Sequence, residues 1–154
     1  MARPLADGLL SDLGQRLGMA GLCLDDAGCC QLLFDQRWLV TLLHLPAPGW
    51  LGLHCPVSAA GATDTLPRGT LLAMLQGSFV GRGAGGAGAT LCVSPDQRAW
   101  LQQVVGIEGS SGERLEQAIE QLLVHAQAWS QRIESGGDDA PASAAPAQWA
   151  MQRV

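Results

Sequence analysis

The sequence predicts an α+β domain built on an antiparallel sheet, and three observations lead to this prediction. Apolar residues recur at helical spacing in three separate stretches of the chain. Between these stretches lie short apolar or alternating segments joined by tight turns, the pattern of β-hairpins. Strands and helices do not alternate in the way that a parallel sheet requires. The expected order is α-β-β-β-β-α-β-β-α, with three helices and a twisted sheet of five to six strands.

The first helix is expected over residues 5–18, because Gly18 stands where glycine commonly ends a helix. The first hairpin follows, with a short apolar run at 22–24, a turn at 25–28 and an alternating segment at 29–35. Leucines at steps of four support the helix: Leu5, Leu9, Leu13 and Leu17.

A second hairpin is predicted from 38–45 and 50–57, which the sequence Pro-Ala-Pro-Gly separates. Pairing the segments around this break places His44 opposite Leu51 and His54 opposite Thr41. One face is typical of a core: Trp38, Val40, Leu42, Leu51, Leu53 and Cys55. The other is also largely apolar: Leu39, Thr41, Leu43, Leu45, Trp50, Gly52 and His54. A helix of the same subunit, a dimer mate or an extended client could cover this second face.

The second half of the domain starts with a short helix after Pro67, a residue suited to the first helical position. A Gly/Ala-rich loop at 81–88 leads to a third hairpin around the turn 95–98. A capping box at 110–113 precedes the third helix, which runs to Glu134 with apolar steps of four and three. We therefore expect one domain over 1–134 and a flexible Ala/Pro-rich tail over 135–154.

Composition excludes several classes of function. The chain has 154 residues and a formal charge of -5, the wrong sign for a protein that neutralises nucleic-acid phosphates. All nine cations are arginine, so lysine-dependent chemistry is excluded. No stretch approaches the roughly 18 apolar residues of a membrane span, and the N-terminus lacks the pattern of a secretory signal. Five cysteines, an odd number, favour reduced thiols. We expect a cytoplasmic protein without membrane insertion.

Catalytic, metal and cofactor sites are not predicted. The loop contains G-x-G-x-x-G at 81–86, but it follows a helix and enters a strand, the reverse of the order in a dinucleotide site. The adjacent Cys29 and Cys30 point to opposite faces of a strand, and the three histidines do not converge with them on one ion. No cysteine or serine lies in a nucleophile motif. The chain is therefore expected to be neither an enzyme nor a cofactor protein.

Three passages resemble the small acidic type III secretion chaperones of the CesT/SycE (Tir chaperone) family. These are residues 22–35 of the first hairpin, 71–79 of the middle helix and 88–96 entering the last hairpin. With the first and last helices, the resemblance covers about residues 5–134. The Pro-Ala-Pro-Gly connection, the long Gly/Ala loop and the tail depart from the family's pattern.

The resemblance implies a homodimeric chaperone of the bacterial cytosol, acting in virulence, that binds the N-terminal chaperone-binding region of one or more effectors. It would keep that region partly unfolded without consuming ATP, and the secretion-system ATPase is a further candidate partner. Because an unfolded client needs apolar contacts, the candidate cargo-binding residues are Leu9, Leu13, Leu17, Leu33, Leu39 and Leu43. The candidate dimer interface is formed by Leu71, Leu72, Leu75 and Trp100.

Two other classes of function stay open. A regulatory module of the same fold would sequester a cytosolic partner instead of escorting a secreted one. A small-ligand-binding α+β domain would show a bound molecule or a turnover. The identity of the partner separates the first alternative from a chaperone, and native mass spectrometry of the purified protein detects the ligand of the second.

Overall fold

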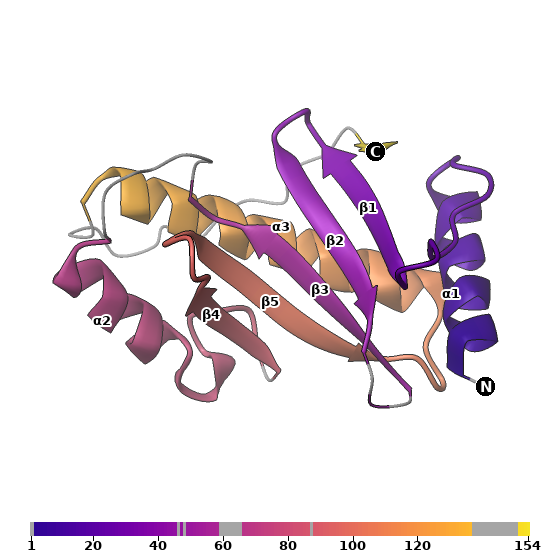
Figure 1. The fold of residues 1–154 in the computed structure, drawn as a ribbon, viewed down its shortest axis with the longest axis horizontal. Helices are drawn as coiled ribbons and strands as arrows, with labels where there is room; N and C mark the ends of the chain where they lie inside the picture. The colour runs from indigo at the N-terminus through magenta and orange to yellow at the C-terminus, as the bar shows by residue number, and fades with distance from the viewer. Residues whose placement is uncertain (1, 46, 48, 59–65, 87, 137–150) are drawn as a thin grey trace. The chain divides into compact units, whose positions relative to one another are not determined.

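The fold is known from a computed structural model that describes residues 2–45, 47, 49–58, 66–86, 88–136 and 151–154. Within these residues it has three α-helices, one short 3-10 helix and six strands (Figure 1). The elements in chain order are α1 (Ala2–Arg16), β1 (Cys29–Phe34), β2 (Trp38–His44), β3 (Trp50–Pro56), α2 (Arg68–Gly77), η1 (Phe79–Gly81), β4 (Ala89–Val93), β5 (Ala99–Gly106), α3 (Gly112–Glu134) and β6 (Met151–Arg153).

The strands form one antiparallel sheet with the order β4-β5-β3-β2-β1-β6, which confirms the predicted α+β class. The chain nevertheless divides into two compact units, which are described one at a time. Unit 1 comprises residues 1–54, 104–120 and 149–154, and unit 2 comprises 55–103 and 121–148.

Unit 1 begins with α1, which ends two residues before Gly18, the predicted stop residue. Gly18 has a φ of 69°, a left-handed conformation that glycine adopts without steric cost. Leu10 and Leu13 are fully buried and Leu9 is 6% exposed, whereas Leu5 is exposed. The leucine stripe therefore serves mainly as the core face of this helix.

The first predicted strand, at 22–24, is wrong. Leu22 and Leu24 are buried and Cys23 is exposed, which is the expected alternation, but the segment pairs with no strand in the described part of the chain. The backbone N–H of Leu24 instead donates to the Asp7 carboxylate at 2.9 Å. A helix side chain thus satisfies a backbone group that a strand partner would otherwise satisfy. Three strands, and not four, precede α2.

The second hairpin has the predicted register. Thr41 lies opposite His54, and His44 lies opposite Leu51. All six residues of the predicted core face are buried, at 5% exposure or less. A backbone hydrogen bond of 3.2 Å from the Leu45 N–H to the Trp50 carbonyl closes the hairpin. The period-2 pattern of the sequence was therefore sufficient to assign both faces.

The N-terminus of α3 is capped differently from the prediction. Ser111 precedes the helix, and its hydroxyl accepts a bond from the Arg114 N–H at 3.3 Å. The Gly112 N–H donates to the carboxylate of Asp12, in α1, at 2.6 Å. A Cβ at Gly112 would lie 2.6 Å from the Asp12 carboxylate, so this contact requires glycine. Two backbone donors of the helix end are satisfied, one of them by a residue 100 positions away.

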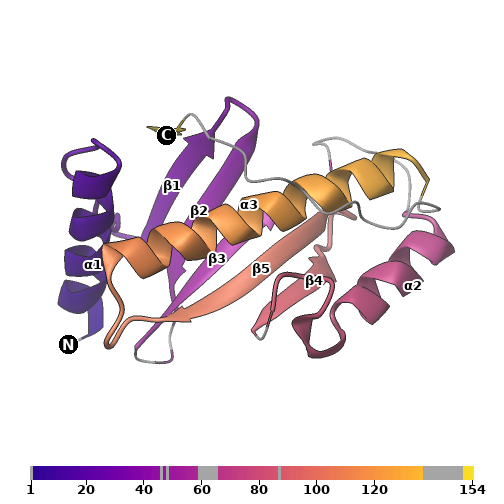
Figure 2. The same ribbon diagram turned by 180° about the vertical axis from the view of Figure 1, so that it is seen from behind.

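Unit 2 contains α2, η1, β4 and the loop that joins them (Figure 2). The loop predicted as flexible is held by specific bonds: the Trp129 indole N–H donates to the Gly83 carbonyl at 2.8 Å, and the Gly83 N–H to the Gly77 carbonyl. A Cβ at Gly77 would lie 2.6 Å from the Trp129 ring. Glycine is needed here because the indole ring lies against the backbone.

The helix α3 ends at Glu134, as the sequence predicts. Residues 137–150, the larger part of the tail predicted to be flexible, lie outside the described residues. Met151–Arg153 forms β6, which pairs antiparallel with β1. The composition of the tail gave no indication of this strand.

Candidate functional site

The six candidate cargo residues fall into two groups. Leu9 and Leu13 are buried in the core of unit 1, so they present no surface to a cargo, and the expectation for these two is corrected. Leu17, Leu33, Leu39 and Leu43 are half-buried. The helical stripe was open to both interpretations, since a core stripe and a binding stripe have the same spacing.

Half-buried side chains gather on one face of the β1-β2-β3 sheet in unit 1. We call this surface the outer face, and it consists of Leu33, Leu39, Thr41, Leu43 and His54. Leu33 lies directly opposite Leu39 on the neighbouring strand, and Thr41 lies opposite His54. Directly opposed residues share a face and pack side by side. The result is a largely apolar surface that retains partial contact with solvent, with the exposed Gln31 opposite Thr41.

Gly52 shapes the third strand of this face. It lies opposite Leu43, and a Cβ at Gly52 would come within 2.6 Å of the His54 ring and 3.3 Å of the Leu45 side chain. The missing side chain therefore leaves the space that the imidazole occupies. Burial lowers the pKa of His54 below its ordinary value, so the ring is neutral at pH 7. The face carries no fixed charge at this position.

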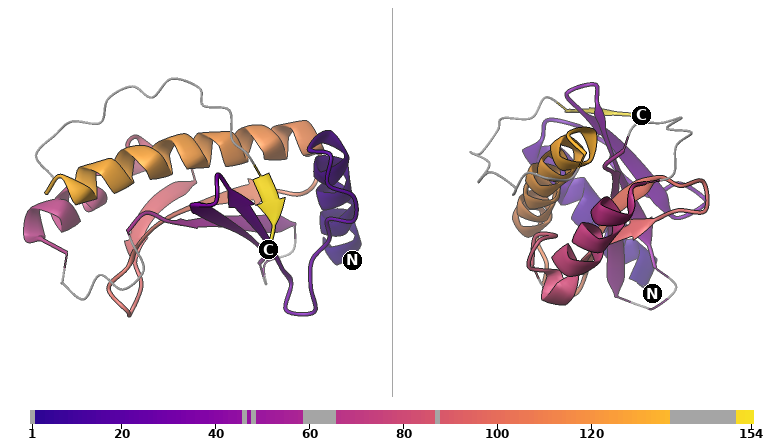
Figure 3. Two further views of the ribbon diagram at one scale, coloured as in Figure 1. Left: turned by 90° about the horizontal axis from the view of Figure 1, so that it is seen from above. Right: turned by 90° about the vertical axis from the view of Figure 1, so that its left-hand side faces the viewer.

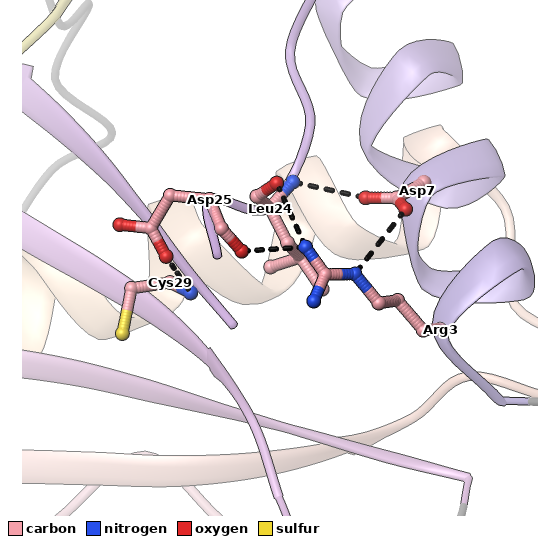
Figure 4. A network of polar contacts seen from close by, with 5 residues as sticks. All are labelled: Arg3, Asp7, Leu24, Asp25 and Cys29. Atoms are coloured by element: carbon pink, nitrogen blue, oxygen red, sulfur yellow. Dashed lines mark hydrogen bonds and ion pairs between the residues drawn. The ribbon is translucent and has the colours of Figure 1, made fainter. Parts of the chain in front are cut away.

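A polar network fixes the entry of β1 (Figure 4). The Arg3 guanidinium donates to the Asp25 carbonyl at 2.6 Å, and Arg3 and Asp7 form an ion pair at 4.0 Å within α1. The Asp25 carboxylate accepts a bond from the Cys29 N–H at 2.8 Å, while the Asp25 N–H donates to the Cys29 carbonyl. Asp25 thus closes the turn before β1 through its side chain and its main chain, and the first residue of β1 has both backbone groups satisfied.

Unit 2 has an apolar surface of a different kind. We call it the α2 patch, formed by Leu72, Leu75, Phe79 and Val80, which are 53%, 70%, 70% and 69% exposed. Val80 has a φ of 54°, which a β-branched side chain rarely adopts. The sequence identified the leucines but not Phe79 and Val80 as surface residues, because helical spacing alone does not show where the helix ends.

The other two candidate interface residues are less exposed. Leu71 and Trp100 are half-buried. The Trp100 indole N–H donates to the Ser94 hydroxyl at 3.0 Å, and the Arg98 guanidinium lies 5.3 Å from the ring centroid. Trp100 therefore already has polar partners within its own chain, and it is not a free anchor of the kind that Leu75 is.

The cysteines are free thiols. Burial raises the pKa of Cys55 to about 12 and raises the pKa values of Cys30 and Cys92, so these three are poor nucleophiles at neutral pH. Among the described residues, no three His, Cys, Asp or Glu side chains lie close enough to hold a metal ion. None of the described helices is long and apolar enough to span a membrane.

The outer face and the α2 patch have the chemistry of surfaces that bind other polypeptides. Apolar strand residues with half their surface covered suit an extended segment, and strongly exposed helix residues suit a partner helix or a second copy. Two such surfaces on an α+β domain are typical of proteins that bind other polypeptide chains.

The chain belongs to the Tir chaperone protein (CesT) family, whose profile matches residues 8–130. This is the family of type III secretion chaperones that the sequence resembles, so the protein is a chaperone of this class. Among curated proteins, none matches the sequence.

Solved structures share the fold at low sequence identity. The crystal structure of the ExsC-ExsE complex has a TM-score of 0.71 and 24% identity, covering 85% of this chain and 95% of the other. The HopA1-SchA chaperone-effector complex has a TM-score of 0.68 and 22% identity, covering 82% and 94%. The Yersinia pestis type III secretion chaperone SycH, in complex with a fragment of YscM2, has a TM-score of 0.63 and 18% identity, covering 79% and 96%.

Proposed function

We propose that this protein is a homodimeric cytosolic chaperone that binds an N-terminal segment of a type III secreted effector and keeps it extended until export. The single observation that carries the proposal is the largely apolar outer face, where the cross-strand pair Leu33–Leu39 and, four residues further along β2, Leu43 lie on the same face of regular strands. An extended client can pair its backbone with a sheet edge and place alternate side chains on such a face. Family membership and the chaperone-effector complexes of similar fold support this function.

The work of the protein is binding and needs no turnover. Folding of the client would bury the same apolar side chains that the chaperone holds, so the chaperone competes with the client's own collapse. Fully burying one leucine side chain contributes about 1.5 to 3 kcal/mol, whereas an exposed ion pair contributes about 0 to 1 kcal/mol. Binding without ATP hydrolysis is consistent with these magnitudes. The formal net charge of -5 would favour solubility of the complex.

Dimerisation through the α2 patch is part of the proposal. Four large apolar side chains at 53% to 70% exposure lie on and after one short helix. A two-fold interface would bury each of them twice, once for each protomer. We place Leu71 and the exposed part of Trp100 at the margin of this interface.

The decisive experiment identifies the effector and then changes the outer face. Proteins that co-purify with the chain from its native host identify the client. Calorimetry then measures the affinity of the purified chain for a synthetic segment of that client. The double variant Leu33→Asp and Leu43→Asp is expected to lower affinity at least a hundredfold, since two leucine contacts of about 1.5 kcal/mol each are lost. The matched control, Gln117→Glu and Gln121→Glu, adds the same two charges to exposed positions of α3.

The wild-type affinity is expected to survive high salt, because apolar contacts are not screened. A folded double variant that binds with wild-type affinity would overturn the proposal. So would a wild-type complex that moderate salt dissociates.

A further inference from the structure

The last strand of the chain occupies an edge of its own sheet. β6 pairs with β1 on the side opposite β2, with Leu32 opposite Arg153, Leu33 opposite Gln152 and Phe34 opposite Met151. Figure 3 shows the C-terminal strand, in yellow, beside the dark purple strand β1. In the part of the chain that the structure describes, β1 would be an edge strand without it.

The register shows which backbone groups β6 covers. The His44 N–H donates to the Gly28 carbonyl, so the even-numbered residues of β1 exchange hydrogen bonds with β2. The odd-numbered residues therefore direct their backbone groups to the other side. The Val154 N–H donates to the Gln31 carbonyl at 3.3 Å, which makes the Leu33–Gln152 pair the next hydrogen-bonded pair toward β6.

The remaining odd-numbered residue of β1 is also satisfied. Both backbone groups of Cys29 bond to Asp25, one through its carboxylate and one through its main chain. The three odd-numbered residues of β1, whose backbone groups point away from β2, thus all have partners within the chain. An extended client can pair with this edge of β1 only after the segment that occupies it has left. Of the two segments that occupy it, the Asp25 turn and β6, the short C-terminal strand β6 is the one that can leave.

Three features make β6 a replaceable occupant. The strand has three residues, about half the usual length of five to six. Gln152, opposite Leu33, places an exposed polar side chain next to the apolar Leu33–Leu39 pair. Beyond the ladder, the side-chain bond that holds the strand among the described residues runs from the Arg153 guanidinium to the Gly21 carbonyl at 3.1 Å. A client strand with an apolar residue in the place of Gln152 would gain contacts that the tail lacks.

We propose that β6 is a self-occupying strap, a strand that closes the β1 edge and that an extended, apolar client segment displaces. This inference rests on the proposed function, which supplies the client. The strap shields an unpaired edge from other chains when no client is bound, because open edges invite aggregation. It also weakens the binding of a client, since the measured affinity equals the affinity for the free edge multiplied by the fraction of time that the edge is free.

The strap is tested without a client by a peptide of residues 148–154 labelled with a fluorophore. The probe is expected to bind a chain ending after Gly136 about tenfold more tightly than it binds the full chain, if the tethered strand leaves the edge free about a tenth of the time. Gln152→Pro in the full chain removes the N–H that faces β1 and should give affinity close to that of the shortened chain. Gln152→Ala is the matched control and should behave as the wild type.

Hydrogen exchange reports on the same edge in the full chain. The Leu33 amide is expected to lose protection in Gln152→Pro, while the Leu32 amide, which faces β2, keeps it. Retained protection at Leu32 also shows that the variant is folded. Equal binding of the peptide to the full and shortened chains, or binding to neither, would overturn the proposal.

The effector segment identified for the proposed function gives the final test. Gln152→Pro should raise its affinity about tenfold, and Gln152→Ile, which adds an apolar β-branched residue to the strap, should lower it. Effector binding that is equal in the wild type and both variants overturns the strap and leaves the proposed function intact. An effector that binds none of the three overturns the proposed function, and the peptide experiment still decides about the strap.

Discussion

The outer face of unit 1 and the α2 patch of unit 2 are both apolar, but they differ in how much of each side chain is covered. The leucines of the outer face are half-buried by their strand neighbours, whereas Leu75 and Phe79 are each 70% exposed. A half-covered face can lose and regain a client at a moderate cost in exposed apolar area. In the proposed dimer, the second patch would be covered permanently. The comparison teaches that two apolar surfaces of one chain can differ in exposure, and the proposed function assigns the less exposed one to a client and the more exposed one to the second copy.

The largest expected effect comes from Leu75→Asp in the α2 patch. In a two-fold dimer the change acts twice, so the loss is about 3 kcal/mol or more, which weakens the dimer at least a hundredfold. Light scattering after size exclusion should show a monomer at tens of micromolar protein. The single variant Leu33→Asp is the matched comparison and should remain a dimer. If both variants dissociate equally, or if the wild type is already a monomer, the distinction between the two surfaces fails.

The next effect separates two glycines of α2. Gly77→Ala places a Cβ 2.6 Å from the Trp129 ring and should destabilise the fold by about 1 to 3 kcal/mol. Gly69→Ala meets nothing within 4 Å and should stabilise by about 0.5 to 1 kcal/mol through helix propensity. Urea unfolding followed by circular dichroism measures both. If Gly77→Ala is as stable as Gly69→Ala, the Trp129 indole does not pack against α2 at Gly77.

A smaller effect concerns the attachment of β1 in unit 1. Asp7→Ala removes the acceptor of the Leu24 N–H and the partner of Arg3, and we expect a loss of about 1 kcal/mol. Leu5→Ala, at an exposed position of the same helix, is the control and should change stability little. If the two variants have the same unfolding free energy, the polar network does not stabilise the entry of β1.

The smallest effect is the pH dependence of stability between pH 7 and 5.5. Burial lowers the pKa values of His54 in unit 1 and His125 in unit 2, so the unfolded chain binds protons first as the pH falls. The stabilisation is complete above the unfolded value of about 6.5 and is lost as the pH falls toward the folded values. His54→Gln and His125→Gln should each flatten the slope of the unfolding free energy. A slope unchanged in both variants would contradict the burial of these rings.

The sequence by itself determined the features that depend on local period and turn chemistry. The register of β2 with β3, the core face of that hairpin, the stop at Gly18 and the end of α3 at Glu134 all follow from residue spacing. The family also follows from such patterns, because its motifs are distributions of apolar residues and turns along the chain.

Tertiary structure decided which members of each apolar stripe are core and which are surface. Leu9 and Leu75 occur in similar helical patterns, yet one is 6% exposed and the other 70%. Periodicity states that residues share a face and does not state what lies against that face. Long-range polar partners were equally invisible: Asp7 replaces a strand partner for Leu24, Asp12 caps a helix 100 residues later, and β6 closes the edge of β1. Each depends on two distant segments meeting in space, and composition and spacing carry no information about such a meeting.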